Sequence, residues 1–551
     1  MRDEVSHSEF RTTRLQFSLQ AMPSLINPWL IAVTVMSATF MEVLDSAVVN
    51  VARRHIAGAF ASSADEATWV LTSYLISNAI VLVGTGWLSS YFGRKRMLSC
   101  CLAIFTIASV LCGAAPNLPF LIVARVIQGI GGGTLQPTAQ AVLLESFPPS
   151  KRGQAMCMYT LGVMVAPLMG PTLGGWVADN YSWRWIFYLN LPVGVFAIAM
   201  TQIFIVDPPY LRRVRGGRID YLGFALMAVG LGALQVVLDK GQRDDWFSSG
   251  FIRTLTTVAV LALGGFIFRE LSIERPIVNL RALGNRNFAV GVLLVTAIGG
   301  AAFYGVITLL PLFTETILGY TATLSGETLA WRGVGALIAT GIVWRLSGKI
   351  DTRLMLSCGF GLLALSVYML GDVNLEVAQS AFLWPGIING FGFGLISAPL
   401  TTIAVNTLRT EQISNATGIF NLMRNVGGGI GVSVVTTLLA RREQWHQRIL
   451  ASRLTPNDWL FKQRLQQMGR LLGSRRPYGL VAGGQTFLRQ SQGSLGTERA
   501  YGLIYGRLLR QSALLAFVDI FRLLAVLCVV CVPLAFIFKK MEPGRGESEV
   551  H

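Results

Sequence analysis

Two carboxylates lie inside a stretch that otherwise has the character of a membrane-spanning helix, in the sequence Phe40-Met41-Glu42-Val43-Leu44-Asp45-Ser46-Ala47-Val48-Val49-Asn50. An ionisable side chain in hydrocarbon costs several kcal/mol, about 3 on insertion scales, so it normally faces a bundle interior or an aqueous cavity. Glu42 and Asp45 are three residues apart and therefore share one helix face with Ser46 and Asn50. This polar stripe predicts that a proton or a cation is bound inside the protein.

A cationic residue also lies inside an apolar run. Arg125 is near the middle of such a run and, like the two acids, must be paired or hydrated. We expect it to pair with Glu42 and Asp45, where a nearby cation would keep Asp45 ionised until a proton or a cationic substrate competes with it. The alternative is an arginine that bonds to helix carbonyls and braces its own helix. As carriers of a proton we rank Asp45 first and Glu42 second.

Two further acids, Asp519 and Glu327, lie within or near the start of later apolar runs, and with Arg424 they are secondary candidates for the site. Asp519 and Arg522 are three residues apart and could form a self-contained ion pair. The four histidines fall outside the apolar runs, so ion coupling inside a membrane would rest on carboxylates. The seven cysteines fall within or at the edges of apolar runs, which argues against disulfides and zinc sites, and we expect no metal.

The composition is that of an integral membrane protein. Of 551 residues, 52% are hydrophobic and only 14% are charged, which a soluble domain of this length would not tolerate. Runs of about 20 apolar residues predict membrane-spanning helices. They lie at 28–49, 69–90, 97–114, 118–143, 154–177, 186–206, 219–238, 251–268, 288–313, 324–345, 354–371, 381–407, 416–440 and 513–538. We therefore expect an all-α membrane protein with fourteen spans.

Basic residues give the expected orientation, because cytoplasmic loops carry an excess of Lys and Arg. With the N-terminus inside, these loops hold Arg94, Lys95, Arg96, Lys151, Arg152, Arg212, Arg213, Arg215, Arg218, Arg275, Arg281, Arg286, Lys349 and Arg353. Both terminal segments, 1–27 and 539–551, are then cytoplasmic, and we see no removable signal peptide in the first. The net charge of +17 follows mostly from this distribution. A nucleic-acid partner would need basic residues on one soluble face and is disfavoured.

An internal repeat divides the chain into two halves. The segment 86–95 has the same seven-residue glycine spacing as the segment 341–349, and the segment 128–133 parallels the segment 389–394 glycine for glycine. We expect six-helix halves at 28–206 and 288–538 with two extra spans at 219–268, since such repeats are typical of secondary transporters. The hydrophilic insertion at 441–510 lies outside in this topology. It is either a docking surface for another protein or a solvated connector.

Several motifs in these segments resemble those of the major facilitator superfamily. They are Leu44-Asp45-x-x-Val48-Val49-Asn50-Val51-Ala52, the loop from Gly86 to Arg96, Arg125-Val126-Ile127-Gln128-Gly129 and Gly170-Pro171-Thr172-Leu173-Gly174-Gly175. The chain is also similar to EmrB-type drug:proton antiporters, from about residue 28 to 540. This similarity rests on the fourteen spans, the long outer loop and three further features: Glu42, Trp183-Arg184-Trp185-x-Phe187 and Arg424-Asn425-x-Gly427-Gly428. The resemblance implies the major facilitator fold and associates Arg125 with proton transfer.

A gate is expected in the inner loop that holds Gly86, Gly93, Arg94, Lys95 and Arg96. Glycine at position 93 permits a tight turn, and the three basic residues could pair with acidic or helix C-terminal groups of the other half in one state. The alternative is an anchor for topology alone. Ser90 stands where relatives often carry an Asp, so the ion pair usually assigned to that Asp is not assumed.

The fifth span is rich in proline and small residues: Pro167, Gly170, Pro171, Gly174 and Gly175. These residues predict a kink and a face that another helix can approach closely. In the resembling family this stretch marks antiporters as opposed to symporters, whereas helix packing alone would also explain the composition. Two departures are Ala166, where glycine is common, and Ala52-Arg53-Arg54, where relatives typically have Ala-Leu-Pro.

The expected energy source is a proton gradient, because the chain holds no Gly-x-x-x-x-Gly-Lys-Ser/Thr motif, and we expect no cofactor and no enzymatic chemistry. A proton crossing about 100 mV gains about 2.3 kcal/mol from the potential. The expected function is export of small hydrophobic or cationic drugs across the inner membrane in exchange for protons. Open alternatives are a lipid or lipid-precursor flippase on the same scaffold and a transport-dead sensor. The resemblance implies a periplasmic adaptor protein at the outer loop and an outer-membrane channel beyond it.

Overall fold

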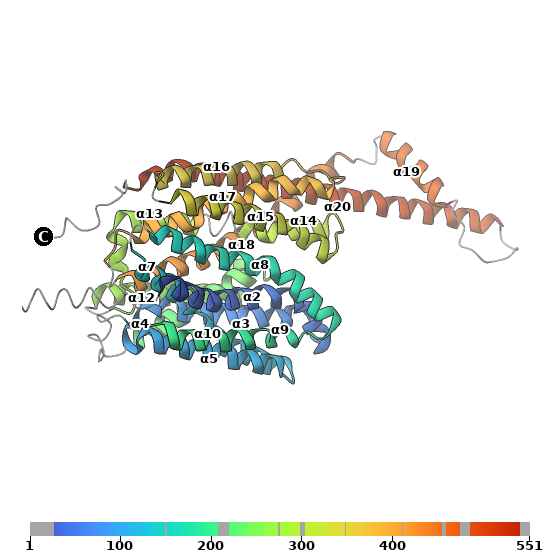
Figure 1. Ribbon diagram of the computed structural model, residues 1–551. Coiled ribbons are helices and arrows are strands. Elements are labelled where there is room, and N and C mark those ends of the chain that lie inside the picture. Colours follow the sequence, from blue (N-terminus) through green and yellow to red (C-terminus); the bar gives the residue numbers. More distant parts are fainter. Residues whose placement is uncertain are drawn as a thin grey trace, which may run out of the picture.

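The computed structural model describes residues 27–148, 151–207, 220–273, 276–297, 304–347, 349–409, 412–454, 459–473 and 485–539. In these residues every regular element is a helix, which confirms the expected all-α class. Figure 1 shows the helices side by side along one common direction, with α19 and the start of α20 projecting from one end. The segments 1–26 and 540–551, and the basic connector 208–219, lie outside the described residues.

The helices can be grouped, in chain order, by the two predicted halves and the two predicted extra spans between them. The first half holds α2 (Pro28–Ala59), α3 (Ala64–Val83), α4 (Thr85–Phe92), α5 (Arg94–Gly113), α6 (Leu118–Gly132), α7 (Leu135–Ser146), α8 (Arg152–Asn180), α9 (Trp185–Tyr188) and α10 (Asn190–Phe204). The extra helices are α11 (Tyr221–Lys240) and α12 (Gly250–Ser272). The second half holds α13 (Arg286–Leu294), α14 (Gly305–Thr316), α15 (Ala322–Leu346), α16 (Thr352–Leu370), α17 (Leu383–Val405), α18 (Ile413–Ser452), α19 (Trp459–Gly473) and α20 (Gln485–Leu534).

Eleven helices in the described part of the chain are long and apolar enough to cross a membrane. The long helices α8 and α15, together with α13 and α14, cover the described parts of the remaining expected spans. The described parts of all fourteen apolar runs therefore fall on helices. The runs 69–90, 118–143 and 186–206 are not single helices, because the chain breaks at Gly84, at 133–134 and at Leu189. Residues 298–303 of the run 288–313 lie outside the described residues.

Polar residues at the helix ends fix where several helices begin. Asn27 accepts a hydrogen bond from the backbone N–H of Trp29 (3.0 Å) at the start of α2. Asp220 caps α11 by accepting from the backbone N–H of Gly223 (3.0 Å). The same carboxylate accepts three bonds of 2.8–3.0 Å from the Arg269 guanidinium of α12. This cap therefore also ties the two extra helices together.

The glycine repeat of the sequence recurs in the structure as a repeat of contacts. Gly129 of α6 packs against the backbone of α3, and Gly390 of α17 packs against the backbone of α15. Two residues further along, Gly131 meets the backbone of α5 and Gly392 meets that of α16. These partners are the second and third spans of their respective halves. Equivalent glycines in the two halves therefore pack against equivalent helices, since small residues let helix backbones approach closely in membranes.

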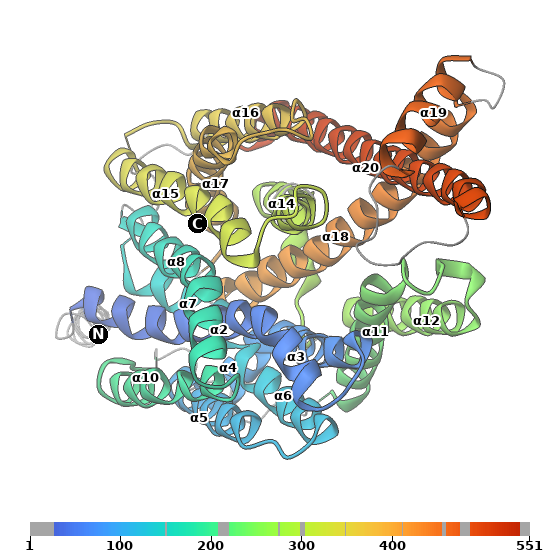
Figure 2. The same cartoon turned by 90° about the vertical axis from the view of Figure 1, so that its right-hand side faces the viewer.

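Hydrophobic packing differs between the two ends of the molecule. At the end that holds Arg94, called the Arg94 end below, one buried cluster draws side chains from both halves. There Trp29 of α2 stacks on Trp344 of α15 with 5.2 Å between the ring centroids. At the opposite end, from which α19 projects, each half has its own cluster, one around α2, α8 and α9 and one around α14, α18 and α20. Figure 2 looks onto this second end and shows the two halves with α11 and α12 beside them.

Candidate functional site

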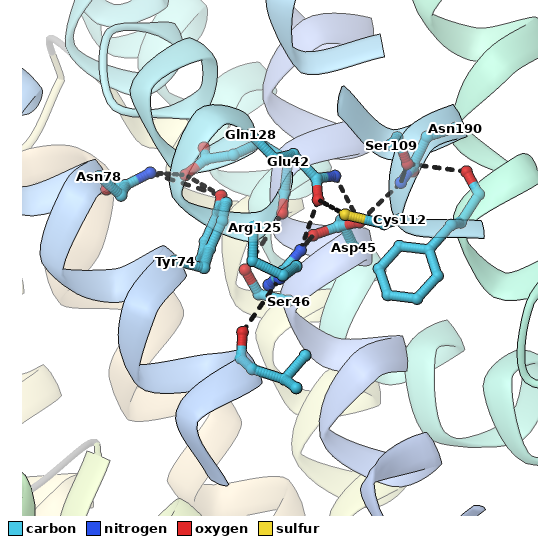
Figure 3. A network of polar contacts seen from close by, with 12 residues as sticks. Glu42, Asp45, Ser46, Tyr74, Asn78, Ser109, Cys112, Arg125, Gln128 and Asn190 are labelled. Atoms are coloured by element: carbon cyan, nitrogen blue, oxygen red, sulfur yellow. Dashed lines mark hydrogen bonds and ion pairs between the residues drawn. The ribbon is translucent and has the colours of Figure 1, made fainter. Parts of the chain in front are cut away.

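Asp45 and Arg125 form a fully buried ion pair inside the first half (Figure 3). Nη1 of Arg125 lies 2.6 Å from Oδ2 of Asp45. The other carboxylate oxygen, Oδ1, accepts from the side-chain amides of Gln128 (2.9 Å) and Asn190 (2.7 Å). Donors from α6 and α10 therefore hold both oxygens of a charge that α2 supplies. This is the pairing that the sequence led us to expect.

Arg125 has further partners that fix its position. Its Nε donates to the backbone carbonyl of Val70 on α3 at 3.1 Å, and its Nη1 also reaches Oε1 of Gln128 at 2.8 Å. The guanidinium carbon lies 4.2 Å from the centre of the Tyr74 ring, a cation–π distance. Both interpretations from the sequence therefore apply, because Arg125 neutralises Asp45 and also braces α6 against α3.

Glu42 lies one helical turn from Asp45 and is 5% exposed. Its Oε1 accepts from Nδ2 of Asn78 at 3.1 Å and from the Tyr74 hydroxyl at 3.5 Å. Among the described residues its Oε2 has no hydrogen bond. The two carboxylates thus differ, since a guanidinium holds Asp45 whereas uncharged donors hold Glu42. A proton on Glu42 would therefore break no direct ion pair.

Four polar residues around these acids were not singled out from the sequence: Tyr74, Asn78, Asn190 and Ser109. Asn190 donates to Ser109 Oγ (3.0 Å) as well as to Asp45, and Ser109 donates to a backbone carbonyl of α9 (2.8 Å). Tyr74 and Asn78 are four residues apart in an apolar run, which is a polar stripe like that of α2. That spacing was the available signal. Asn190 is a single polar residue at a helix start and offered none.

Gly132, the last residue of α6, lies directly against this second stripe. A Cβ atom added at Gly132 would lie 2.9 Å from the Tyr74 hydroxyl and 3.2 Å from Nδ2 of Asn78. The absence of a side chain at position 132 therefore leaves the space in which Tyr74 and Asn78 reach Glu42.

Arg424 of α18, a secondary candidate from the sequence, reaches this site from the second half. Its Nη2 donates to Oε1 of Gln136 on α7, and the Tyr159 hydroxyl of α8 donates to the same oxygen at 3.4 Å. Gln136 lies beside Glu42, whose own hydrogen bonds are to Asn78 and Tyr74. The second half's cation is thus bonded to a glutamine of the first half that neighbours the acid.

The other two secondary candidates lie elsewhere. Asp519 of α20 contacts Arg442 (3.6 Å) and His446 (2.9 Å), both in the C-terminal part of α18. The expected local pair with Arg522 is wrong, because Asp519 faces α18 whereas Arg522 faces the turn that follows α16. Glu327 is exposed near the start of α15. Neither acid joins the buried cluster in the first half.

The expected gate loop forms a tight turn between α4 and α5. Gly93 has a φ of +82°, and a Cβ atom there would lie 2.6 Å from Oδ2 of Asp207. The other oxygen of Asp207 accepts from the backbone N–H of Lys95 at 2.9 Å. Arg94 makes a two-pronged bond to Glu145 of α7, with 2.6 Å between Nη2 and Oε1. These bonds join elements of the first half, so they fix the turn and do not bridge the halves.

Other residues do join the halves at this end. A Cβ atom at Gly86 would lie 2.9 Å from the Cα of Asn415 on α18, so the helices meet closely there. Arg96, the last basic residue of the loop, is exposed. Besides the bond from Arg424 to Gln136, hydrogen bonds that cross between the halves in the described residues include Arg152 Nη1 to Asn406 Oδ1 (2.6 Å), Thr417 Oγ1 to the Pro137 carbonyl (3.1 Å) and Asn421 Nδ2 to Gln140 Oε1 (2.7 Å).

The small-residue face of the fifth span packs on the helix that carries the acids. Gly170 of α8 contacts Ala47, and a Cβ atom at Gly174 would lie 2.7 Å from Cγ1 of Val48. Of the other residues named there, Pro167 is exposed, Gly175 is half-buried, and the side chain of Pro171 is outside the described part of the structure. The close approach expected from the glycines is therefore present, and α2 is the helix that approaches.

The sequence pattern of a known family covers most of this chain. The family described as Major Facilitator Superfamily matches residues 35–432. The chain belongs to the major facilitator superfamily. It is therefore a multi-pass membrane transporter by family, and the resemblance stated from the motifs is confirmed.

Proteins named for export and resistance are among the relatives of this superfamily member. It is 39% identical over 429 residues to the multidrug export protein EmrB of Escherichia coli strain K12, covering 76% of this chain and 81% of that protein. It is 35% identical over 506 residues to the fatty acid resistance protein FarB of Neisseria gonorrhoeae, covering 91% and 94%. The solved structure of the proton:xylose symporter XylE with 6-bromo-6-deoxy-D-glucose has a TM-score of 0.55 at 16% identity, covering 76% of this chain and 90% of that one. This last likeness shows the fold alone.

Proposed function

We propose that this transporter exports small hydrophobic or cationic toxic compounds across the inner membrane in exchange for protons. The observation that carries the proposal is the buried Asp45–Arg125 pair with Glu42 one turn away, since ionisable groups this deep are retained where ions are bound and released. Relatives named for multidrug export support drugs as the substrate class. The basic Arg94 end is then the cytoplasmic side, as the positive-inside rule requires.

The two carboxylates offer a proton different sites. Protonating Asp45 would leave Arg125 buried without its counter-charge, so Asp45 takes a proton only when a cationic substrate or a shift of α6 replaces that partner. Glu42 has only uncharged direct donors and can take a proton without breaking a direct ion pair. We keep Asp45 as the residue on which coupling depends and Glu42 as the second carrier.

Alternating access is supported by the way the halves pack. One hydrophobic cluster joins them at the Arg94 end, whereas each half has its own cluster at the opposite end. This arrangement fits a state closed to the cytoplasm, in which substrate is released outward. In the opposite state, the halves would be joined at the end from which α19 projects and separate at the Arg94 end.

The projecting helices support a periplasmic adaptor as a partner. The expected outer loop is largely helical, because α18 continues to Ser452, α19 packs on α20 and α20 begins at Gln485. Four aromatic side chains on these helices are about half exposed or more: Trp445 (50%), Trp459 (66%), Tyr501 (49%) and Tyr505 (55%). Exposed aromatic residues of this kind are frequent anchors of protein interfaces. We propose this surface as the adaptor site of an envelope-spanning pump.

The deciding experiment is proton movement driven by substrate in liposomes that contain the purified protein and a pH-sensitive dye. The panel holds lipophilic cations, uncharged apolar compounds and long-chain fatty acids, with a labelled phospholipid for the flippase alternative. Export coupled to protons predicts that at least one compound moves protons in a saturable way. If no compound moves protons while the labelled lipid is flipped, the flippase replaces the proposed function.

A further inference from the structure

Arg424 occupies a position that the proposed exchange of protons does not by itself explain. It belongs to α18 of the second half, yet it donates to Gln136 of the first half, which lies beside Glu42. The contact lies where the halves are joined, beside the hydrogen bonds from Asn421 and Thr417 of the same helix. A change at Glu42 can therefore reach the boundary between the halves through two side chains.

We propose that Arg424 and Gln136 form a latch that holds the Arg94 end closed while Glu42 is ionised, and that a proton on Glu42 releases this latch. The proposal rests on the proposed proton-driven export and names the residues that couple the proton to the conformational change. Arg424 is a positioning residue in this scheme, because it acts through Glu42 and Gln136 and carries no proton itself.

The charges around Glu42 support this assignment. The polar and charged groups that face it are Asp45 of its own helix, Tyr74 and Asn78 of α3, Gln136 of α7, Tyr159 of α8 and Arg424 of α18. Arg125 is the other nearby cation, and Asp45 already neutralises it. The remaining positive charge is therefore supplied by Arg424. In a site of low dielectric, attraction between such charges is strong and disappears when the carboxylate becomes neutral.

The hydrogen bonds of Gln136 show how the attraction is passed on. Its carbonyl oxygen accepts from Arg424 and from Tyr159. Its amide group is then the donor that remains for Glu42, whose Oε2 has no hydrogen bond among the described residues. An ionised Glu42 accepts such a donor well, whereas a protonated one offers a weaker acceptor. Protonation thus weakens the attraction of Glu42 both for the Arg424 charge and for the neighbouring Gln136 amide.

The direction of the effect is the one that an exporter requires. Ionised Glu42 favours the state closed at the Arg94 end, and protonated Glu42 favours the state open there. A proton that enters from outside would then open the cytoplasmic side. Its departure into the cytoplasm would close that side again around a bound substrate. The proton is transferred only between water and the carboxylate, so no other reactant is needed.

The test measures the distance between the halves at the Arg94 end as a function of pH. Spin labels are placed at the exposed positions Lys151 and Lys349, in protein whose native cysteines are replaced, and distances are recorded in lipid nanodiscs. Labelled protein that keeps Glu42 and Arg424 should show a short distance between the two labels at alkaline pH. A second population with a longer distance should grow as the pH falls. Glu42→Gln and Arg424→Gln should each give the long distance at both pH values, with loss of the pH response.

A matched control separates the latch from general loosening of the boundary. Asn406→Ala removes a bond between the halves that does not involve Glu42, and it should keep the pH response. Arg424→Lys keeps the charge and should restore a response if Arg424→Gln proves unstable. A pH response that survives Glu42→Gln, or its absence with Glu42 and Arg424 intact, overturns the latch. If the protein shows the pH-dependent distances but no substrate drives proton movement in liposomes, the export proposal fails and the latch does not.

Discussion

Asp45 and Arg125 illustrate a dependence that buried charges impose on each other. Each is fully buried, and each satisfies the other at 2.6 Å. Removing one partner of such a pair leaves an uncompensated charge and typically costs about 3–5 kcal/mol. The pair is therefore needed for folding in this state as well as for the proposed exchange, and experiments must separate the two roles.

Asp45→Asn should abolish proton-coupled export, because the exchangeable site on which coupling depends is removed, and it should also lower stability. The measurement is uphill drug export into or out of proteoliposomes, with thermal unfolding recorded on the same sample. The double change Asp45→Asn with Arg125→Gln removes both charges, so it should recover much of the stability without recovering export. If Asp45→Asn exports drug uphill at the unmodified rate, the assignment is wrong.

Gly93→Val should slow the exchange between the two states. A β-branched residue at a φ of +82° is strained by about 1–3 kcal/mol, and its Cβ atom would also collide with Asp207. Accessibility labelling from both sides of the membrane, together with transport rates, measures the effect. Gly284→Val is the control, because no atom lies within 4 Å of its Cβ position, and it should be close to neutral. Unchanged transport and labelling in Gly93→Val would contradict a role for this turn in gating.

At the residue level, the sequence allowed prediction of the charged members of the site and missed their uncharged neighbours. Glu42, Asp45 and Arg125 stand out because a charge in an apolar run is costly and needs a reason. Asn190 and Gln136 carry no such cost and occur in helices for many reasons. Their importance depends on which helices become neighbours, and spacing within one helix does not contain that information.

At the scale of helices, the cap between α11 and α12 makes a prediction about pH. Hydrogen bonds from Arg269, together with the backbone N–H of Gly223, lower the pKa of Asp220, which lies just outside the membrane span. Because the folded-state pKa lies below the unfolded value of about 4, stability from this cap is present above that pH and is lost as pH falls through the folded pKa. Asp220→Asn should therefore lower the unfolding temperature at neutral pH and have little effect in strong acid.

Thermal unfolding of detergent-solubilised protein across an acid series tests this prediction. Asp245→Asn is a suitable control, since Asp245 is exposed and has a φ of +55° that asparagine also tolerates. It should change the unfolding temperature little at any pH. A constant difference between Asp220→Asn and the unmodified protein, from neutral pH to strong acid, would show that the cap is not titrating in this range.

Helix positions were predicted well from hydropathy, and helix breaks were not. The run 118–143 was read as one span, but the structure divides it at 133–134 between α6 and α7. Hydropathy averages over many residues and therefore cannot show a local break in an apolar stretch. The breaks nevertheless have consequences, because the one after Gly132 places α7, and with it Gln136, against the acids.

At the scale of the whole molecule, the projecting helices separate transport from resistance in cells. Replacing residues 450–505 with a short Gly/Ser linker should spare proton-coupled transport in liposomes, because loop closure depends only weakly on length. The same change should remove drug resistance in intact double-membraned cells, because the proposed adaptor surface is lost. Resistance assays at matched expression, paired with liposome transport, give the answer. Resistance that survives at equal expression would make the projecting helices a connector.

The unbroken length of α18 has a mechanical consequence. One helix of 40 residues carries Asn415, Asn421 and Arg424 near its start and ends at Ser452 in the projecting part. At about 1.5 Å per residue, Ser452 lies about 55 Å from Asn415, so a tilt of about 10° would carry its tip by about 10 Å. A protein clamped to that tip would be pushed at each turnover, and a load applied to the tip would in turn resist opening of the far end.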